Sequence, residues 1–177
     1  LIRANYEASA AKGRLTAGLT RPVPSHTALG LRTLVLREER LGVVLRPDHP
    51  LATRRSLPWK SLAGEPLIVL ARREGASLHD ALLAACRNAG FMPRLARTPS
   101  VIGTVLSYTE GGAGLGIVTD SVLPPGTTLC FVPLTPAQTV PLVLVWQEDL
   151  DPPPLQRFRG LLEDWKTTRQ LWPGRPD

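Results

Sequence analysis

The chain is poor in cysteine and histidine. Among its 177 residues there are two cysteines, Cys86 and Cys130, and three histidines, His26, His49 and His79. The cysteines lack the C-x-x-C spacing of zinc and redox motifs, and the histidines lie far apart in the sequence. This sparse set argues against a metal site and fits a reducing compartment, so we expect neither a metal nor a cofactor.

Long apolar runs are also missing. The longest, such as PLIVLA and VPLVLVW, fall short of the roughly 18 apolar residues that a membrane span requires. Near the N-terminus, Lys12, Arg14 and Arg21 interrupt the sequence before the apolar core of a signal peptide could form. We therefore expect a cytoplasmic protein with no membrane partner.

Basic residues outnumber acidic ones, but their arrangement does not indicate a nucleic-acid interface. Lys and Arg number 21 against 15 Asp and Glu, which gives a net charge of +6 and the electrostatic part of DNA affinity. The pairs Arg54–Arg55 and Arg72–Arg73 lie in connectors, and neither a helix-turn-helix nor an aromatic platform for single strands can be recognised. Direct DNA binding by this chain is therefore not expected.

The middle of the chain alternates between strand and helix patterns. PLIVLA (66–71) is continuously apolar, like a strand buried on both faces, and RLAR (94–97) and LGIVT (115–119) are two further strands. Helices are predicted between them, over 77–89 and from about 99 to 110. This βαβαβ order predicts an α/β fold with a parallel sheet.

Additional elements are expected on both sides of this region. Strands are predicted at 15–20, 31–36, 41–45, 127–134 and 140–146, with the charged residues 37–40 separating the second from the third. The segment DPPPLQRFRGLLEDW predicts a closing helix with Asp151 as its cap and prolines in its first turn. The buried stripe expected on this helix consists of Leu155, Phe158, Leu162 and Trp165.

The helix over 77–89 has the clearest local signals. Ser77 is a candidate N-cap, Gly90 supplies the stop, and apolar residues recur at the three-to-four spacing of one buried face. Cys86 lies on that face without a neighbouring base that would make it a thiolate, so we interpret it as a packing residue rather than a nucleophile.

The glycine-rich segment GGAGLG (111–116) superficially resembles a dinucleotide-binding loop. Such a loop follows a strand and opens a helix, whereas this one follows a helix and opens a strand. We therefore interpret it as the end of one helix and a tight entry into the sheet.

Several of these segments, in this order, resemble one known family. The runs LREERLGVVLRPDHPLATRRSLPWKSLAGEPLIVL, LLAACRNAGFMPRL, VLSYTEGGAGLGIVTDSV, CFVPL and PLVLVWQED are similar to the effector-binding domain of LysR-type transcriptional regulators, over about residues 12–165. DHPLA and EGGAGLGIVTDS together make the resemblance fairly specific. In GRLTAGLTRP, Thr16 stands where the family usually has an aspartate.

The resemblance implies two Rossmann-like lobes of the type II periplasmic-binding-protein kind. The first lobe is expected to comprise residues 1–65 plus 139–177, with its N-terminal part missing, and the second residues 66–138. The connector with DHPLA and SLAGEP would then carry the chain between lobes. His49 in that connector has no Asp or Cys partner in sequence, so we interpret it as a local hydrogen-bonding group.

The resemblance also implies a function. A small anionic effector would bind in the cleft between the lobes of a bacterial regulator and control DNA binding and transcription. The expected partners are the effector and further copies of the chain, as a dimer of this domain and a tetramer of the full protein, with DNA bound only through an absent N-terminal helix-turn-helix domain. The alternatives are a free solute-binding protein of the same fold and, less favoured, an enzyme.

Effector-binding residues are expected in loops at the carboxyl ends of strands, where helix N-termini present free N–H groups. These loops contribute Thr20, Arg21, Arg72, Ser77, Thr98, Ser100 and Val101. Hydroxyls and arginines there suit a carboxylate, but serine and threonine are equally typical of helix caps, and for Ser77 and Thr98 both interpretations stay open. The sequence offers no Ser-His-Asp order and no acid pair, so no catalytic residue is predicted.

Overall fold

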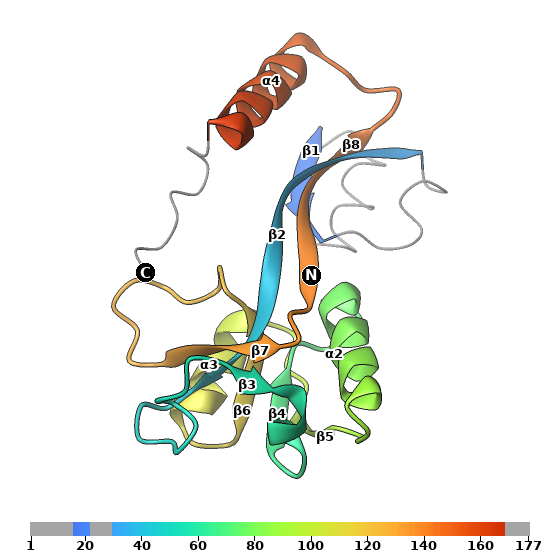
Figure 1. Ribbon diagram of the computed structural model, residues 1–177. Helices are drawn as coiled ribbons and strands as arrows, with labels where there is room; N and C mark the ends of the chain where they lie inside the picture. Colours follow the sequence, from blue (N-terminus) through green and yellow to red (C-terminus); the bar gives the residue numbers. More distant parts are fainter. Residues whose placement is uncertain (1–15, 22–29, 169–177) are drawn as a thin grey trace. The chain divides into compact units, whose positions relative to one another are not determined.

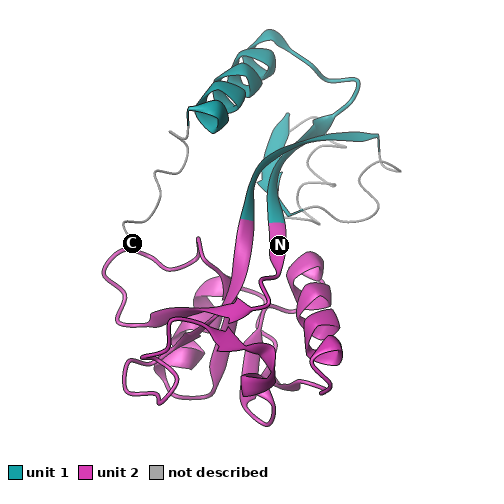
Figure 2. Cartoon of the chain, viewed as in Figure 1, with its two compact units in different colours: residues 1–38, 141–177 teal, residues 39–140 magenta. Residues whose placement is uncertain are grey.

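The computed structural model describes residues 16–21 and 30–168 (Figure 1). The chain divides into two compact units, one formed by residues 1–38 and 141–177 and the other by residues 39–140 (Figure 2). We call them unit 1 and unit 2 and consider each by itself. No helix in the described part of the chain combines the length and the apolar character that a membrane span needs.

Unit 2 contains a parallel sheet with a helix after each of its first two strands. β4 (Pro66–Val69) pairs in parallel with both β5 (Arg94–Arg97) and β6 (Leu115–Thr119). Between them run α2 (Ala76–Asn88) and α3 (Ile102–Glu110). The predicted βαβαβ order is therefore confirmed.

The two helices cover opposite faces of this sheet (Figure 1). Leu67 and Val69 of β4 belong to the same buried cluster as the apolar face of α2, whereas Ile68 packs in a second cluster with Val105 of α3. Successive residues of a strand point to opposite faces, so a strand covered on both faces reads as the continuous apolar run seen in the sequence. Cys86 of α2 is fully buried in the first cluster, which confirms its packing role.

Antiparallel strands complete unit 2. The second half of β2 (Leu31–Leu45) pairs with β6 and with β7 (Cys130–Thr135), and β3 (Leu57–Pro58) pairs with β7. The short 3-10 helix η2 (Trp59–Leu62) follows β3, and the Trp59 indole N–H donates to the Pro136 carbonyl at 2.9 Å.

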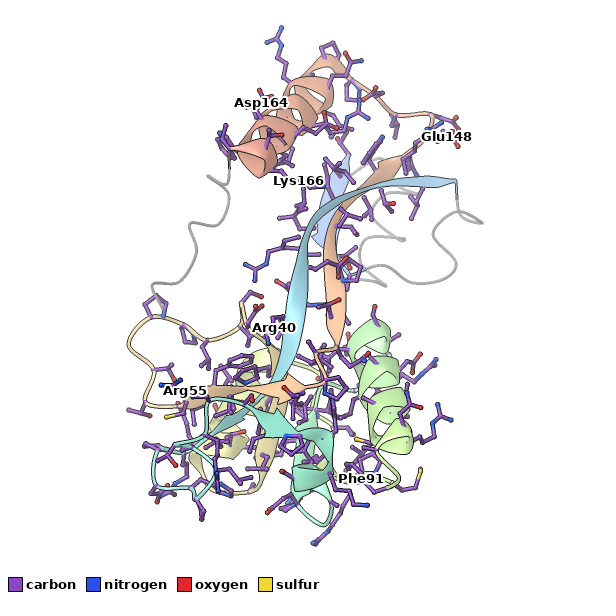
Figure 3. The ribbon with its side chains drawn as sticks, in the orientation of Figure 1. Arg40, Arg55, Phe91, Glu148, Asp164 and Lys166 are labelled. Carbon is purple, nitrogen blue, oxygen red and sulfur yellow. The ribbon has the colours of Figure 1, made fainter. Side chains whose placement is uncertain are left out.

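Unit 1 consists of antiparallel strands and one helix. β1 (Ala17–Thr20) pairs with β8 (Thr139–Gln147), and α4 (Pro153–Thr167) follows. The Lys166 ammonium near the end of α4 donates to the Val35 carbonyl of β2 at 2.9 Å (Figure 3). The larger of the two buried clusters described in this unit consists of Leu36, Leu144, Trp146, Leu155 and Leu162.

The structure differs from the predicted strands and boundaries in β2. The two strands expected at 31–36 and 41–45 form one strand of 15 residues, which continues through the charged segment. Its last five residues pack in unit 2, and so do β3 and η2. The division of the chain therefore lies at residues 38/39 and 140/141, and residues 39–65, expected in the first lobe, belong to unit 2.

Helix α4 also differs from its prediction. Its N-cap is Pro152, and Asp151 instead accepts a hydrogen bond of 2.8 Å from the Arg159 guanidinium. Of the expected stripe, Leu155 and Leu162 are buried, but Phe158 and Trp165 are 42% and 40% exposed. The spacing identified the helix correctly and overestimated the width of its covered face.

The glycine segment confirms its structural interpretation. Gly111 is the C-cap of α3, and Gly112 and Gly114 have φ angles of 75° and 149°. A Cβ atom on Gly114 would lie 2.3 Å from the Pro66 carbonyl oxygen, so only glycine lets the chain pass this close to β4. The segment thus closes a helix and enters β6.

Candidate functional site

The carboxyl ends of β4, β5 and β6 meet at one edge of unit 2, because these three strands are parallel. The loops that follow β4 and β5 are joined there by a hydrogen bond of 2.8 Å from the Ala71 N–H to the Pro99 carbonyl. We call these two loops, residues 70–75 and 98–101, the edge loops. They bring Arg72 and Ser100, which are far apart in sequence, to one edge of the sheet.

The second edge loop leads into α3 with exposed hydroxyls. Thr98 and Ser100 are both exposed, and neither hydroxyl forms a hydrogen bond with another described residue. The N-cap of α3 is Val101, 52% exposed, and no side chain caps the helix. The capping interpretation of Thr98 is therefore wrong, and the first N–H groups of α3 lack a side-chain acceptor.

The first edge loop carries Arg72, whose position is fixed by α2. Its guanidinium donates from Nε and Nη2 to the two carboxylate oxygens of Asp80, at 2.7 and 2.8 Å. This contact holds the pKa of Asp80 below its usual range, mainly through the hydrogen bond. The next residue, Arg73, donates to Glu74 at 3.2 Å. Both arginine side chains remain mostly exposed.

Ser77 has a different place from the one predicted. The N-cap of α2 is Gly75, so Ser77 is the second residue of the helix and does not cap it. The turn just before α2 is closed by two backbone hydrogen bonds to the Ala71 carbonyl, from the N–H groups of Glu74 and Gly75, at 2.8 and 3.1 Å. Ser77 thus lies in the first turn of α2, next to the first edge loop.

Thr20 and Arg21, the remaining predicted residues, lie in unit 1. Thr20 ends β1 and is half-buried, and its hydroxyl lies 3.4 Å from the Arg21 carbonyl oxygen. Arg21 follows the strand and is half-buried as well. Thr20 is thus the last residue of a strand and Arg21 the first residue after it.

A buried carboxylate near the carboxyl end of β6 was not predicted. Glu39 of β2 is 1% exposed, and its carboxylate accepts a hydrogen bond from the Ser121 hydroxyl, which lies 3.3 Å from the Thr119 hydroxyl. The Asp120 N–H donates to the Arg40 carbonyl at 3.0 Å. The signal in the sequence was the polar group TDS directly after an apolar strand.

The chemistry available at the edge loops is that of anion binding. Exposed hydroxyls, guanidinium groups and the positive end of the α3 dipole lie in two adjacent loops, and all can donate hydrogen bonds to an oxyanion. Burial raises the pKa of the Cys86 thiol to about 11, so it is no nucleophile. Among the described residues there is also no group of three side chains that could hold a metal ion.

The sequence matches a family model described as LysR substrate binding domain over residues 3–166. A probable hydrogen peroxide-inducible genes activator from Mycobacterium avium is 34% identical over 114 residues, which cover 64% of this chain and 35% of that protein. The HTH-type transcriptional regulator TtuA from Agrobacterium vitis is 31% identical over 160 residues, which cover 85% of this chain and 51% of that protein.

Solved structures show the same fold. A crystal structure of CbnR, described as a LysR family transcriptional regulator, superposes with a TM-score of 0.79 at 21% identity. The match covers 93% of this chain and 57% of that one. The chain thus spans between 35% and 57% of the length of these three proteins.

Proposed function

The chain belongs to the LysR substrate-binding domain family, and from this we propose that it is the part of a bacterial transcription regulator that senses a small molecule. The relatives reported above are regulators and are longer than this chain. Control of DNA binding would therefore belong to a longer protein. We propose that this longer protein has a DNA-binding domain outside the present sequence and is cytoplasmic. We also propose that it forms a homo-oligomer, either a dimer or a tetramer.

We propose that the effector is a small carboxylate, bound at the edge loops of unit 2. The observation that carries this proposal is the N-terminus of α3, where Thr98 and Ser100 present free hydroxyls and no side chain occupies the helix end. An oxyanion there would accept charge-assisted hydrogen bonds and interact favourably with the helix dipole. Arg72 from the adjacent loop would add charge.

Further residues of both units belong to the proposed effector set. Val101 would supply its backbone N–H group and an exposed apolar side chain, and Ser77 lies in the first turn of α2. Thr20, the last residue of β1, and Arg21, the residue after it, are included because they lie at a strand end, where ligands bind in open α/β sheets.

A thiol-based response to peroxide is not part of the proposal, although the relative from Mycobacterium avium is named for hydrogen peroxide induction. Cys86 is fully buried and its pKa is raised, so it stays a thiol at neutral pH. Cys86 and Cys130 are both free cysteines and form no disulfide.

The test is a thermal-shift screen of the chain with small aromatic and aliphatic carboxylates, benzoate first. Binding to the folded form alone raises the melting temperature with ligand concentration. Replacing Ser100 by Ala should weaken binding of the carboxylate by about 1 to 3 kcal/mol, the cost of a hydrogen bond to a charged group. The melting temperature without ligand should stay unchanged, because Ser100 does not cap α3.

Ser56→Ala is the matched control, since Ser56 is an equally exposed serine of unit 2 outside the edge loops. It should leave both quantities unchanged. The proposal fails if no carboxylate stabilises the protein, or if Ser100→Ala and Ser56→Ala bind the carboxylate equally well.

A further inference from the structure

A cavity of about 370 Å³ lies at the other end of the unit 2 sheet. Pro66 and Leu115 in its wall are the first residues of β4 and β6, and Leu45 is the last residue of the antiparallel strand β2. The edge loops follow the carboxyl ends of the parallel strands, so this cavity is a separate place. Its size falls within the range of about 300 to 1,000 Å³ that is typical of small-molecule sites.

The buried part of the cavity wall is largely apolar. Leu45 and Leu115 are 0% and 3% exposed, so the apolar surface that a ligand can reach belongs to exposed Pro50 and half-buried Pro66. Thr109, also in the wall, is buried, and its hydroxyl donates to the Val105 carbonyl at 2.9 Å within α3. This hydroxyl is therefore satisfied, and the wall favours an apolar group over a polar one.

Charged residues surround the more exposed part of the cavity. Arg46 donates from Nε and Nη2 to both carboxylate oxygens of Asp48, at 3.0 and 2.6 Å, so each neutralises the other. Glu65 is half-buried in the same wall, and its carboxylate forms no hydrogen bond or ion pair with any described residue. Asp48 is paired with Arg46, and His49 in the same wall accepts a hydrogen bond at Nδ1 from the Leu51 N–H at 3.2 Å, so the carboxylate of Glu65 has no partner among the described residues.

The backbone around Glu65 is held in place. The Glu65 N–H donates to the Leu62 carbonyl at 3.2 Å, and Gly64 before it has a φ angle of 87°. On the other side, Gly114 passes so close to Pro66 that no Cβ atom fits between them. The wall is therefore formed without a ligand, which lowers the cost of binding one.

We propose that this cavity binds a small organic amine, with its ammonium group at Glu65 and its apolar body against Pro50 and Pro66. A carboxylate ligand is disfavoured, because the guanidinium of Arg46 is already occupied by Asp48 and the carboxylate of Glu65 would repel it. The cavity would thus accept a ligand of the opposite charge from the one proposed for the edge loops, and it does not depend on that proposal.

The probe for the test is benzylamine, titrated into the ¹⁵N-labelled 177-residue chain and followed by amide chemical shifts. Saturable shifts are expected at Glu65, Gly112 and Gly114, which lie in the cavity wall. Benzyl alcohol, of nearly the same shape without the charge, should bind at least about tenfold more weakly, because it lacks a charged hydrogen bond. Benzoate should shift none of these amides, whatever it does at the edge loops.

Glu65→Gln removes the charge and keeps the shape, and it should weaken benzylamine binding by about tenfold or more. Glu110→Gln is the matched control, because Glu110 is an exposed glutamate of unit 2 outside the cavity wall, and it should bind like the unaltered chain. The proposal is overturned if benzylamine shifts no amide of the wall, or if Glu65→Gln binds it as well as Glu110→Gln does.

The comparison of benzylamine with benzyl alcohol uses only the unaltered chain, so it decides the question even if Glu65→Gln does not fold. Equal affinity for the two probes would overturn the role of charge. A response to benzylamine without one to any carboxylate of the screen would support this site and refute the carboxylate proposal. A response to carboxylates without one to benzylamine would support the edge loops and overturn this site.

Discussion

Asp80 occupies the guanidinium that would otherwise be free for an effector. Both donor groups of Arg72 that contact it lie within 2.8 Å of its carboxylate oxygens, and the pair is largely exposed. An exposed ion pair is worth only about 0.2 to 1 kcal/mol, so a carboxylate ligand can compete with Asp80 for Arg72. The strength of the Asp80 contact therefore tunes the affinity of the edge loops for anions.

Asp80→Asn should release Arg72 and tighten benzoate binding by up to about fivefold, the equivalent of one exposed ion pair. Thermal-shift titration measures this affinity. Asp48→Asn is the control, because it frees Arg46, which lies at the opposite end of the unit 2 sheet. Weaker benzoate binding by Asp80→Asn than by Asp48→Asn would contradict a role for Arg72.

The same ion pair has a pH dependence with a definite sign. The pKa of Asp80 is lowered in the folded protein, chiefly by the hydrogen bond from Arg72. Its contribution to stability is therefore fully present above the unfolded value of about 3.9 and is lost as the pH falls through the folded pKa. The contribution is small, because both groups are exposed to solvent.

Cys86 should be unreactive in the folded protein. Burial raises its pKa to about 11, so the neutral thiol is favoured, and the associated stability is present below the unfolded pKa and is lost as the pH rises toward 11. Iodoacetamide at pH 8 should label Cys86 only after unfolding in urea, and half-buried Cys130 sooner. Cys86→Ala should cost about 1 to 3 kcal/mol of stability and leave benzoate affinity unchanged. Rapid iodoacetamide labelling of Cys86 in the native protein, detected by mass spectrometry, would contradict the burial of this thiol.

At the scale of elements, the sequence predicted the strands and helices whose apolar pattern lies within one short segment. The strands β4 and β6 and the helix α2 were predictable because each has an uninterrupted apolar run or a regular apolar face. β2 was not recognised as one strand, because its charged middle resembles a loop. In the structure, Glu39 alone of that charged segment is buried, and its partner Ser121 is 82 residues away.

The candidate site was predictable to a similar extent. Strand ends followed by hydroxyls and arginines predicted the residues of the edge loops. The sequence could not tell that Asp80 holds Arg72, that Gly75 rather than Ser77 caps α2, or that Glu65 lies in a cavity wall. Each of these depends on how elements pack and on where a helix begins, which residue types alone do not fix.

The glycine segment between α3 and β6 gives a prediction for an element. Gly114→Ala places a Cβ atom on the Pro66 carbonyl oxygen in a backbone conformation that is almost restricted to glycine, with φ at 149°. It should lower the free energy of unfolding by about 2 to 4 kcal/mol. Gly111→Ala is the control, because Gly111 has a φ of −72° and the nearest atom would be 3.4 Å away. Urea unfolding measures both, and equal losses would contradict the packing described here.

For the whole molecule, the two units differ in how the chain builds them. Unit 2 is one continuous segment, whereas unit 1 is assembled from the two ends of the chain. The larger buried cluster lies entirely in unit 2 and joins α2 to residues of β2, β3 and η2, among them Leu45, Leu57 and Trp59. A continuous segment with its own core is expected to fold independently.

The fragment 39–140 should therefore fold by itself, with dispersed amide resonances and a cooperative urea transition. It contains the whole cavity wall, so it should bind benzylamine as the full chain does.

The matched control is the fragment 66–138, the lobe expected from the sequence alone. It lacks the buried residues Leu41, Val43, Leu45, Leu57, Trp59 and Leu62, and burying each such side chain contributes about 1.5 to 3 kcal/mol. For six side chains the lost stabilisation is at least about 9 kcal/mol. A typical small domain has a total stability of only about 5 to 15 kcal/mol. We expect the shorter fragment to remain unfolded, and a cooperative transition in it would show that β2, β3 and η2 are not needed for the core of unit 2.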